Sequence, residues 1–531
     1  KYKVKGGSLL VERFFFFLIN HSKKPLTQIC KSVNISQGNL KSSKRRYVGP
    51  KPRKRYFFGI LAEREMDKMY DVIIVGGGPA GIFSALELTK AGMKVVIIEK
   101  GRPIEKRHCP QAELQKCVRC KPCDIMCGWG GAGAFSDGKL TLTTEYGGWL
   151  DEYLPKADVL KMIHYADEQY IKYGSPQKIY GDDFQDEIRS LKQRSAAADL
   201  QLIPARIRHL GTDNAYSILK AMSDDIAQKA DIRTLTMVEE IVPGKDGAAH
   251  KVILKGGEEI SAKYLIAAPG REGAEWFRAQ ATKLGLPMTN NSVDIGVRVE
   301  LPAEIFAPIT DVVYESKLIY YTKKFDDQVR TFCMNPYGEV VTENVDGLIT
   351  ANGHSYANKK TQNTNFALLV SKNFTEPFNE PIAYGKSIAR LANMLGNGVI
   401  VQRLGDLLDG RRSTPERIKR GLVQPTLKDA TPGDLSLVLP YRHMTALIEM
   451  FEALDKVAPG TNSRHTLLYG VETKFYSSRL ALSPELESSI PNFFAAGDGA
   501  GVTRGLAQAS VAGIIVARAI LKREGHEVAP I

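Results

Sequence analysis

Long apolar runs are missing from this chain of 531 residues. A membrane-spanning helix needs about 18 or more consecutive apolar residues, and no segment approaches that length. The longest run near the start, Phe14 to Ile19, follows Glu12 and Arg13; it is too short for a span and poor as the core of a secretory signal peptide. We therefore expect no membrane span, a cytoplasmic protein, and at least two domains in a chain of this length.

Acidic residues are scarce in the first 66 positions, which hold 16 Lys or Arg and only 3 Asp or Glu. The remaining residues carry equal numbers of basic and acidic side chains, so the net charge of +13 belongs to this segment alone. A nucleic-acid arm or an organellar transit segment has such a composition, but a nucleic-acid-binding surface should also lie on the folded body. We expect residues 1–66 to be a disordered leader or translated upstream sequence, and we do not expect nucleic acid as a partner.

Cysteines are few and unevenly placed: of seven, only Cys30 and Cys333 lie outside residues 109–127. A secreted protein built on disulfides would be shorter and would spread its cysteines along the chain. The four cysteines from 117 to 127 have the spacing C-x2-C-x2-C-x3-C of a bacterial ferredoxin run, although Gly128 stands where ferredoxins have proline. We predict an iron–sulfur cluster, with a structural zinc ion, a redox dithiol or unliganded thiols as alternatives. The candidate ligands are Cys109, Cys117, Cys120, Cys123 and Cys127.

A strand–turn–helix–strand pattern opens the globular part of the chain. A short apolar run, Asp71–Val75, leads into the sequence Gly-Gly-Gly-Pro-Ala-Gly at residues 76–81. A helical pattern from Ala80 to Ala91 and a second apolar run, Lys94–Ile98, follow. This order predicts a βαβ unit with two parallel strands and a G-x-G-x-x-G turn between the first strand and the helix.

The three glycines of that motif have separate physical roles in a nucleotide-binding turn. Gly76 permits the tight turn, Gly78 lets the backbone approach a pyrophosphate, and Gly81 lets helix and strand pack closely. The N-terminal end of the helix presents N–H groups and a positive dipole to phosphates, and Glu99 after the second strand can accept hydrogen bonds from an adenosine ribose. We predict a dinucleotide site that includes Gly76, Gly78, Pro79, Ala80, Gly81, Glu99 and Lys100.

Two later segments decide between NAD and FAD, which share the first motif. Residues 493–498 form an apolar run that ends in Gly-Asp, and a helical pattern rich in small residues follows from about Gly505. This arrangement resembles the second FAD signature of the glutathione-reductase-like flavoproteins, and residues 264–271 resemble the strand and glycine between their two signatures. The resemblance implies that Asp498 binds the ribityl chain and that the last helix faces the flavin. It adds Gly270, Arg271, Gly497, Asp498 and Gly505 to the predicted FAD site.

A glycine-rich loop at residues 128–138 contains five glycines, whose backbone N–H groups can line a flavin or its pyrophosphate. The alternative is a loop that only turns tightly. Together with residues 330–334, 350–355 and 470–474, the loop resembles a family of bacterial and archaeal FAD-dependent dehydrogenases, usually described only as NAD(P)/FAD-dependent oxidoreductases. The resemblance covers roughly residues 69–525 and implies a fold and a flavin but no substrate. The predicted contacts from this loop are Gly130, Gly131, Gly133 and Lys139.

These observations predict an α/β fold with a Rossmann-like FAD-binding domain built from discontinuous segments and an inserted mixed β-sheet (α+β) substrate domain. We expect the FAD-binding domain at residues 67–293, including a Cys- and Gly-rich loop at 109–148, and again at 461–531. The substrate domain is expected at residues 294–460, which carry no nucleotide motif.

The predicted function is that of an FAD-dependent oxidoreductase that passes electrons between the flavin and a small-molecule substrate, by way of an iron–sulfur cluster if the cysteines hold one. NAD(P)H stays open as electron donor, although no second G-x-G-x-x-G follows a strand. An FAD-dependent RNA-modifying enzyme and a non-catalytic flavin electron-transfer module are the alternatives. His354, near Tyr356 and Asn358, is a candidate for proton transfer, and Arg298 and Arg504 are candidates to balance charge on flavin or substrate.

Overall fold

The computed structural model describes residues 69–531 except 115–117, 137, 246, 346, 357–358, 376, 379 and 475–477. The predicted leader at residues 1–66, together with Cys30 and Cys117, lies outside the described residues. Across this described part of the chain, none of the helices is long and apolar enough to cross a bilayer.

The first of two large sheets has seven strands with β1 (Tyr70–Val75) at its centre. The strands β2 (Val95–Ile98) and β10 (Glu259–Ala267) flank β1 in parallel. Two more strands extend the parallel part: β7 (Asp231–Arg233) beside β2, and β22 (Phe493–Ala495) beside β10. An antiparallel pair, β8 (Val238–Val242) and β9 (His250–Leu254), completes the sheet on the β10 side. The predicted Rossmann-like α/β arrangement is confirmed.

The β-branched and apolar pattern of Ile232–Val242 predicts a strand, but this segment forms two strands at opposite ends of the sheet. The chain leaves β7 after Arg233 and enters β8 at Val238. Between them Leu235 has a φ of 53°, and the backbone N–H of Thr236 donates to the carbonyl oxygen of Glu99 at 3.0 Å. This turn carries neither glycine nor proline, the usual signs of a break, so the sequence alone favours one continuous strand.

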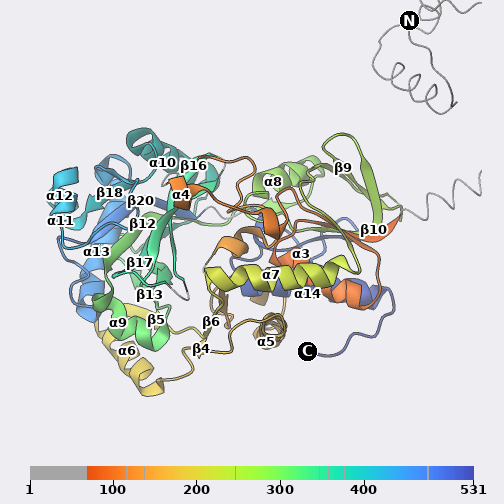
Figure 1. Ribbon diagram of the computed structural model, residues 1–531, viewed down its shortest axis with the longest axis horizontal. Helices are drawn as coiled ribbons and strands as arrows, with labels where there is room; N and C mark the ends of the chain where they lie inside the picture. Colours follow the sequence, from red (N-terminus) through yellow and green to blue (C-terminus); the bar gives the residue numbers. More distant parts are fainter. Residues whose placement is uncertain are drawn as a thin grey trace, which may run out of the picture. The chain divides into compact units, whose positions relative to one another are not determined.

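Helices cover both faces of the first sheet (Figure 1). Alternate residues of β1 point to opposite faces, and the face of Val72 and Ile74 packs against four helices. These are α3 (Pro79–Lys90), α5 (Lys156–Lys172), α7 (Thr212–Ala227) and α14 (Leu506–Arg523). The face of Ile73 and Val75 packs against α8 (Ala274–Lys283) and the β8–β9 pair.

The second large sheet has eight strands in the order β19-β18-β20-β12-β17-β14-β13-β5. Its strands are antiparallel except for the β18–β19 pair. They are β5 (Leu200–Ile203), β12 (Val293–Pro302), β13 (Lys317–Tyr321), β14 (Gln328–Asn335), β17 (Asn363–Lys372), β18 (Ile400–Arg403), β19 (Thr431–Pro432) and β20 (Leu467–Lys474). The sheet therefore extends past the expected boundary at residue 460, and it also takes in β5, which lies within the range 67–293 expected for the FAD-binding domain.

One face of this second sheet is apolar and the other is charged. Odd-numbered residues of β12 from Val293 to Leu301 pack beneath four helices, which are α6 (Gln185–Ala197), α9 (Ala303–Val313), α10 (Pro381–Gly396) and α13 (Tyr441–Val457). The opposite face of β12 carries Asp294, Arg298 and Glu300, which are all fully buried. Charged side chains are almost never fully buried unless they are paired, so the buried charges on this face indicate a candidate functional site.

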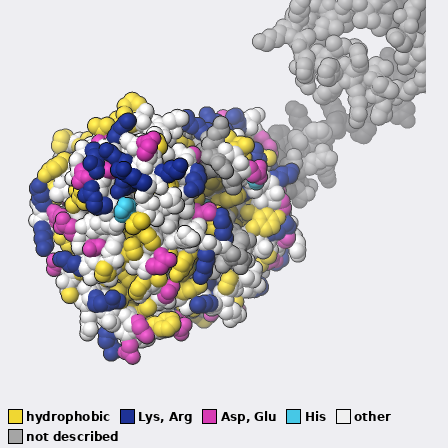
Figure 2. All heavy atoms as spheres, turned by 60° about the vertical axis from the view of Figure 1, so that its left-hand side comes forward, with side chains coloured by type: hydrophobic (Ala, Val, Ile, Leu, Met, Phe, Trp, Pro, Cys, Tyr) yellow, Lys and Arg dark blue, Asp and Glu magenta, His cyan; other side chains and the backbone are white. Residues whose placement is uncertain are grey.

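Smaller elements connect the two sheets. The hairpin of β15 (Glu339–Val345) and β16 (Leu348–His354) lies near the charged face of the second sheet. A three-stranded sheet joins β3 (Lys139–Thr141), β6 (Ile207–His209) and β4 (Ile179–Tyr180). On the face drawn in Figure 2, Lys and Arg side chains are interspersed with Asp and Glu, with one denser group of Lys and Arg.

Candidate FAD site

A cavity of about 630 Å³ is lined by residues of both large sheets. One wall comes from the carboxyl ends of β1, β2 and β10, which is where ligands bind in open parallel sheets. The N-terminal ends of α3 and α14 and the glycine-rich loop also line the cavity, and β13, β14, β15 and β20 close it from the other side. Its volume is within the usual range for cofactor and ligand sites.

The glycine turn before α3 has the geometry that the motif predicts. Gly76 has a φ of 113°, and a Cβ there would lie 2.1 Å from the carbonyl oxygen of Ala268. A Cβ on Gly81 would lie 2.0 Å from the carbonyl oxygen of Gly76. Gly78 faces the cavity, and no side chain caps α3, so N–H groups of the first helical turn remain available to a ligand.

Glu99 holds the turn in place, a role that was not predicted for it. Its buried carboxylate accepts hydrogen bonds from the backbone N–H groups of Gly77 and Gly101, both at 2.8 Å, and of Gly128 at 3.0 Å. Glu99 thereby ties the glycine turn to the Cys- and Gly-rich loop. Because a carboxylate has about four acceptor positions, these bonds leave capacity for the predicted ribose contact.

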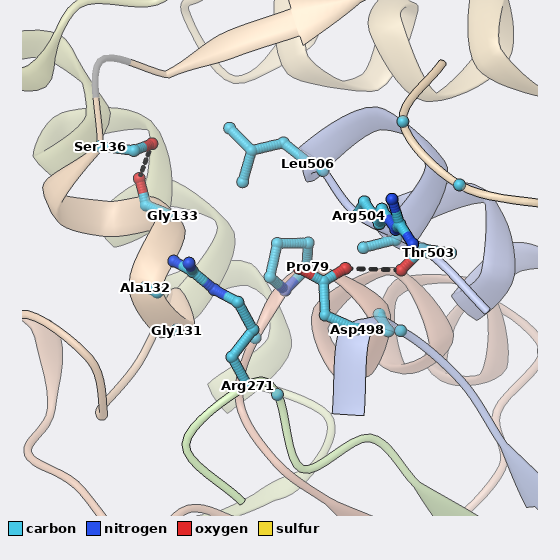
Figure 3. Close-up of a pocket in the computed structure, with 18 of the residues that line it drawn as sticks. Pro79, Gly131, Ala132, Gly133, Ser136, Arg271, Asp498, Thr503, Arg504 and Leu506 are labelled. Carbon is cyan, nitrogen blue, oxygen red and sulfur yellow. Dashed lines mark hydrogen bonds between the residues drawn. The ribbon is translucent and has the colours of Figure 1, made fainter. Parts of the chain in front are cut away.

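The second FAD-like segment reaches the cavity from the opposite end of the chain. Asp498 is half-buried beside the helix start, and Thr503 Oγ1 donates to its Oδ1 at 2.7 Å. Burial raises the pKa of Asp498, while the nearby Arg271 guanidinium acts in the opposite direction. Figure 3 shows Asp498 and Thr503 close to Pro79, with Arg504 and Leu506 beyond them and Arg271 in front. No side chain caps α14 at Gly505.

The two helix starts come together because α3 and α14 pack closely. A Cβ on Gly513 of α14 would lie 2.1 Å from the carbonyl oxygen of Ala80 and 3.0 Å from the backbone nitrogen of Ser84. The Ser84 hydroxyl donates to the carbonyl oxygen of Gly513 at 3.1 Å. The small-residue pattern of the last helix is thus explained by contact with α3, and this contact points both helix N-terminal ends at one cavity.

The predicted cofactor-binding residues are brought together with two exceptions. Fourteen of them line the cavity, namely Gly76, Gly78, Pro79, Ala80, Glu99, Lys100, Gly131, Gly133, Lys139, Gly270, Arg271, Gly497, Asp498 and Gly505. Gly81 and Gly130 do not line it. Gly130 instead donates from its N–H to the carbonyl oxygen of Gly77 at 2.8 Å, and a Cβ there would lie 2.5 Å from Leu219 Cδ1. Both glycines shape the wall instead of facing the cavity.

A buried ion network joins the two sheets beside the cavity. Arg271 contacts Glu343 at 3.1 Å, and Lys474 lies 3.7 Å from the same carboxylate and 3.0 Å from Glu472. Lys100 pairs with Glu272 at the adenosine end of the predicted site. Nearby cations, with Arg271 foremost, lower the pKa of the buried Glu343 against the effect of its burial. Paired charges of both signs therefore line the cavity where the two sheets approach each other.

Arg298, predicted to balance charge on flavin or substrate, lies behind this wall. It is fully buried and does not line the cavity. Its guanidinium lies 3.3 Å from Glu472 and donates to Asn365 Oδ1 and to the carbonyl oxygen of Cys333, both at 2.8 Å. Arg298 thus supports the strands that carry the wall. His354 does line the cavity, Tyr356 does not, and Asn358 lies outside the described residues.

Arg107 organises the Cys- and Gly-rich loop, and sequence reasoning did not identify it. Its buried guanidinium donates to the carbonyl oxygens of Asp124, Trp129 and Gly131 at 2.6 to 2.9 Å. Burial lowers its pKa to about 10, so it remains charged at neutral pH. An isolated arginine outside any motif carries no signal for such a role.

The predicted metal ligands divide between two places. Cys127 lines the large cavity, where burial raises the pKa of its thiol to about 12. Cys109, Cys120 and Cys123 line a separate cavity of about 20 Å³. Within the described residues, which leave out Cys117, no three His, Cys, Asp or Glu side chains are placed to hold a metal ion. The iron–sulfur and zinc assignments therefore remain predictions from spacing.

Two family models match parts of the chain. An FAD binding domain matches residues 69–116, and the C-terminal domain of FAD-dependent proteins matches residues 293–475. An uncharacterised protein of Clostridium beijerinckii is 28% identical over 477 residues, which cover 85% of this chain and 80% of that protein.

Two solved structures are among those with similarity to this chain. Glycine oxidase from Geobacillus kaustophilus has a TM-score of 0.39 and 14% identity, and covers 87% of this chain and 96% of its own. L-proline dehydrogenase from P. horikoshii has a TM-score of 0.38 and 12% identity, and the match covers 87% of this chain and 96% of that enzyme's chain. The sequence matches, together with the site geometry, support a flavoprotein with FAD as its cofactor.

Proposed function

We propose that this protein is an FAD-dependent oxidoreductase that acts on a small molecule bound in the large cavity. One observation carries the proposal: three segments more than a hundred residues apart converge on a single cavity. They are the glycine turn before α3, the Gly270–Arg271 corner after β10, and Gly497–Gly505 before α14. The cavity continues to charged side chains of the second sheet, which leaves room for a substrate beside the cofactor.

The residues present fit FAD at both ends. Gly78 and the uncapped start of α3 would hold the pyrophosphate, and Glu99 with Lys100 would contact the adenosine ribose. Asp498 would bind the ribityl chain, and the uncapped start of α14 would place positive potential at the flavin ring. When bound, FAD supplies the acceptor for two electrons. The protein's own part is to bind, orient and shield the reactants, and NAD(P)H is a candidate electron donor.

Asp498→Ala is expected to weaken FAD binding roughly 10- to 150-fold, because one charge-assisted hydrogen bond is worth about 1.5–3 kcal/mol. The matched control is Asp498→Asn, which keeps the side-chain shape and an acceptor for Thr503 and should lose less. Fluorescence titration of the cofactor-free proteins with FAD measures both affinities. Equal affinity in Asp498→Ala and the unaltered protein would exclude the ribityl contact.

Enzymatic activity is tested separately from binding. FAD-loaded protein is mixed anaerobically with NADH, NADPH and a panel of small metabolites, and flavin bleaching is followed by stopped flow. Bleaching by one compound, with turnover when an acceptor is added, is the expected result. A flavin that is bleached only by dithionite would favour a non-catalytic flavin module.

For the cysteine loop we propose an iron–sulfur cluster, with zinc as the alternative, and the ferredoxin-like spacing is its support. Anaerobically purified protein is then expected to contain iron and acid-labile sulfide. Cys120→Ser should remove both while FAD stays bound. Cys127→Ser is the control, because its thiol lines the other cavity and its loss should leave the metal in place. Stoichiometric zinc, or neither metal, would refute the cluster and leave the flavin proposal intact.

A further inference from the structure

Basic side chains gather at the end of the large cavity that the second sheet forms. Strand alternation turns Lys317 of β13 and Arg330 of β14 toward the cavity, while Leu318 and Val329 pack under the helices. Lys139 of β3 and Arg504 before α14 line the same cavity. We call Lys139, Lys317, Arg330 and Arg504 the cationic end.

Carboxylates match only part of this charge. Lys139 pairs with Glu315 at 2.8 Å, and Arg330 pairs with Asp294. The guanidinium carbon of Arg504 lies 3.8 Å from the centre of the Trp149 ring. The ammonium of Lys317 lies 4.3 Å from the centre of the Tyr146 ring, and no carboxylate among the described residues forms an ion pair with it. When Lys317 is protonated, its ammonium is therefore a positive charge at this end that no ion pair of the described residues balances.

Lys317 is held in an environment that disfavours its charge. Burial lowers its pKa to about 7, and Arg330 and Arg504 act in the same direction. Glu315 and Asp294 act in the opposite direction but do not outweigh burial. Other titratable groups that face this end are Lys139, the Cys333 thiol 3.9 Å from the Lys139 ammonium, Asp498 near Arg504, and Tyr146. Burial raises the pKa of Tyr146 well above 10, so its phenol stays neutral.

We propose that the cationic end binds a carboxylate group of the substrate. The inference rests on the proposed function, since it assigns the substrate side of the same cavity. An anion would offset the excess positive charge, and an arginine beside it can bind both carboxylate oxygens. Tyr146, Trp149 and Phe332 line the neighbouring wall, so the group attached to the carboxylate should be apolar or aromatic.

Binding of a carboxylate is then coupled to the protonation of Lys317. In the free cavity the amine is mostly neutral above pH 7, whereas a bound anion favours the ammonium and raises its pKa. The complex therefore takes up close to one proton per ligand at about pH 8 and close to none at about pH 6. Affinity is expected to fall roughly tenfold per pH unit above pH 7, until the pKa of the complex is reached.

The test uses FAD-loaded protein and isothermal titration calorimetry with benzoate, and with benzamide as the uncharged analogue. Titrations in two buffers of different ionisation enthalpy give the number of protons taken up. The unaltered protein should bind benzoate with the proton uptake and pH dependence given above, and should bind benzamide weakly at every pH.

Variants of Lys317 identify the titrating group. Lys317→Met should weaken benzoate binding about tenfold or more at pH 6 and abolish both the proton uptake and the pH dependence. Lys317→Arg carries a permanent charge, so it should bind benzoate with no proton uptake between pH 6 and 9. If Lys317→Met does not fold, Lys317→Arg alone tests whether Lys317 is the titrating group. His354→Gln changes another ionisable side chain that lines the cavity; it is the control and should retain the uptake.

Three results would overturn the inference while leaving FAD binding intact. They are no benzoate binding at pH 6, equal binding of benzoate and benzamide, and unchanged proton uptake in Lys317→Met. Loss of FAD from both Lys317 variants would instead assign the cationic end to a cofactor phosphate, and that result would also overturn it. Failure of the proposed function is distinct, since the unaltered protein would then hold no FAD.

Discussion

Gly513→Val is expected to abolish FAD retention and to destabilise the fold by about 3 kcal/mol, near the upper end of the usual cost of overpacking. The nearest atoms to the new side chain are backbone atoms of α3, at 2.1 Å for the carbonyl oxygen of Ala80. Backbone cannot turn aside as a flexible side chain can, so α14 must move away from α3. The two helix N-terminal ends would then no longer meet at the cavity.

Lys522→Val is the matched control for this substitution. It introduces the same β-branched residue into the same helix, at an exposed position in its last turn. It should leave FAD content and the unfolding midpoint close to those of the unaltered protein. Flavin absorbance and thermal unfolding measure the two effects, and a Gly513→Val protein that is yellow and as stable as the control would contradict the described helix packing.

Arg298→Met should lower the free energy of unfolding by about 3–5 kcal/mol, the usual cost of breaking a buried ion pair from one side. The substitution removes the guanidinium 3.3 Å from the fully buried Glu472. It also removes the donors to Asn365 and to the carbonyl oxygen of Cys333. Lys474 remains 3.0 Å from Glu472 and limits the loss.

The double variant Arg298→Met/Glu472→Gln separates charge from packing. The second substitution removes the Glu472 carboxylate charge that Arg298 no longer neutralises, so it should recover part of the stability lost in the single variant. Urea unfolding followed by circular dichroism measures both proteins. A single-variant loss below about 1 kcal/mol would mean that the pair is solvated and not buried as described.

The parts of the site that sequence could predict are those set by local backbone constraints. Gly76 and Gly81 are recognisable because no other residue fits their close contacts, and Asp498 because it follows a buried strand at a fixed point. Lys317 was not predictable, since its environment is built by residues from β3, β12, β14 and the α14 start. The same holds for Arg107, whose partners are carbonyl oxygens of a loop.

The spacing of residues in the sequence also fails to show which cavity a side chain faces. Cys127 stands in a regular run with Cys120 and Cys123, yet it faces a different cavity because Gly128 and Trp129 carry the chain toward the nucleotide turn. Likewise, β20 was expected in the final FAD-binding segment, but its eight fully buried or nearly buried residues pair with β12 and β18 in the second sheet. Neither the direction of the Cys127 side chain nor the long-range pairing of β20 has a local signature in the sequence.

Cofactor analysis of the purified protein tests the central claim most directly. The protein is denatured, and the released compound is identified and quantified by chromatography against FAD, FMN and NAD standards. We expect FAD at one molecule per chain, either as purified or after incubation with FAD and removal of the excess. A folded protein that stays colourless and releases no FAD after this treatment would contradict the account.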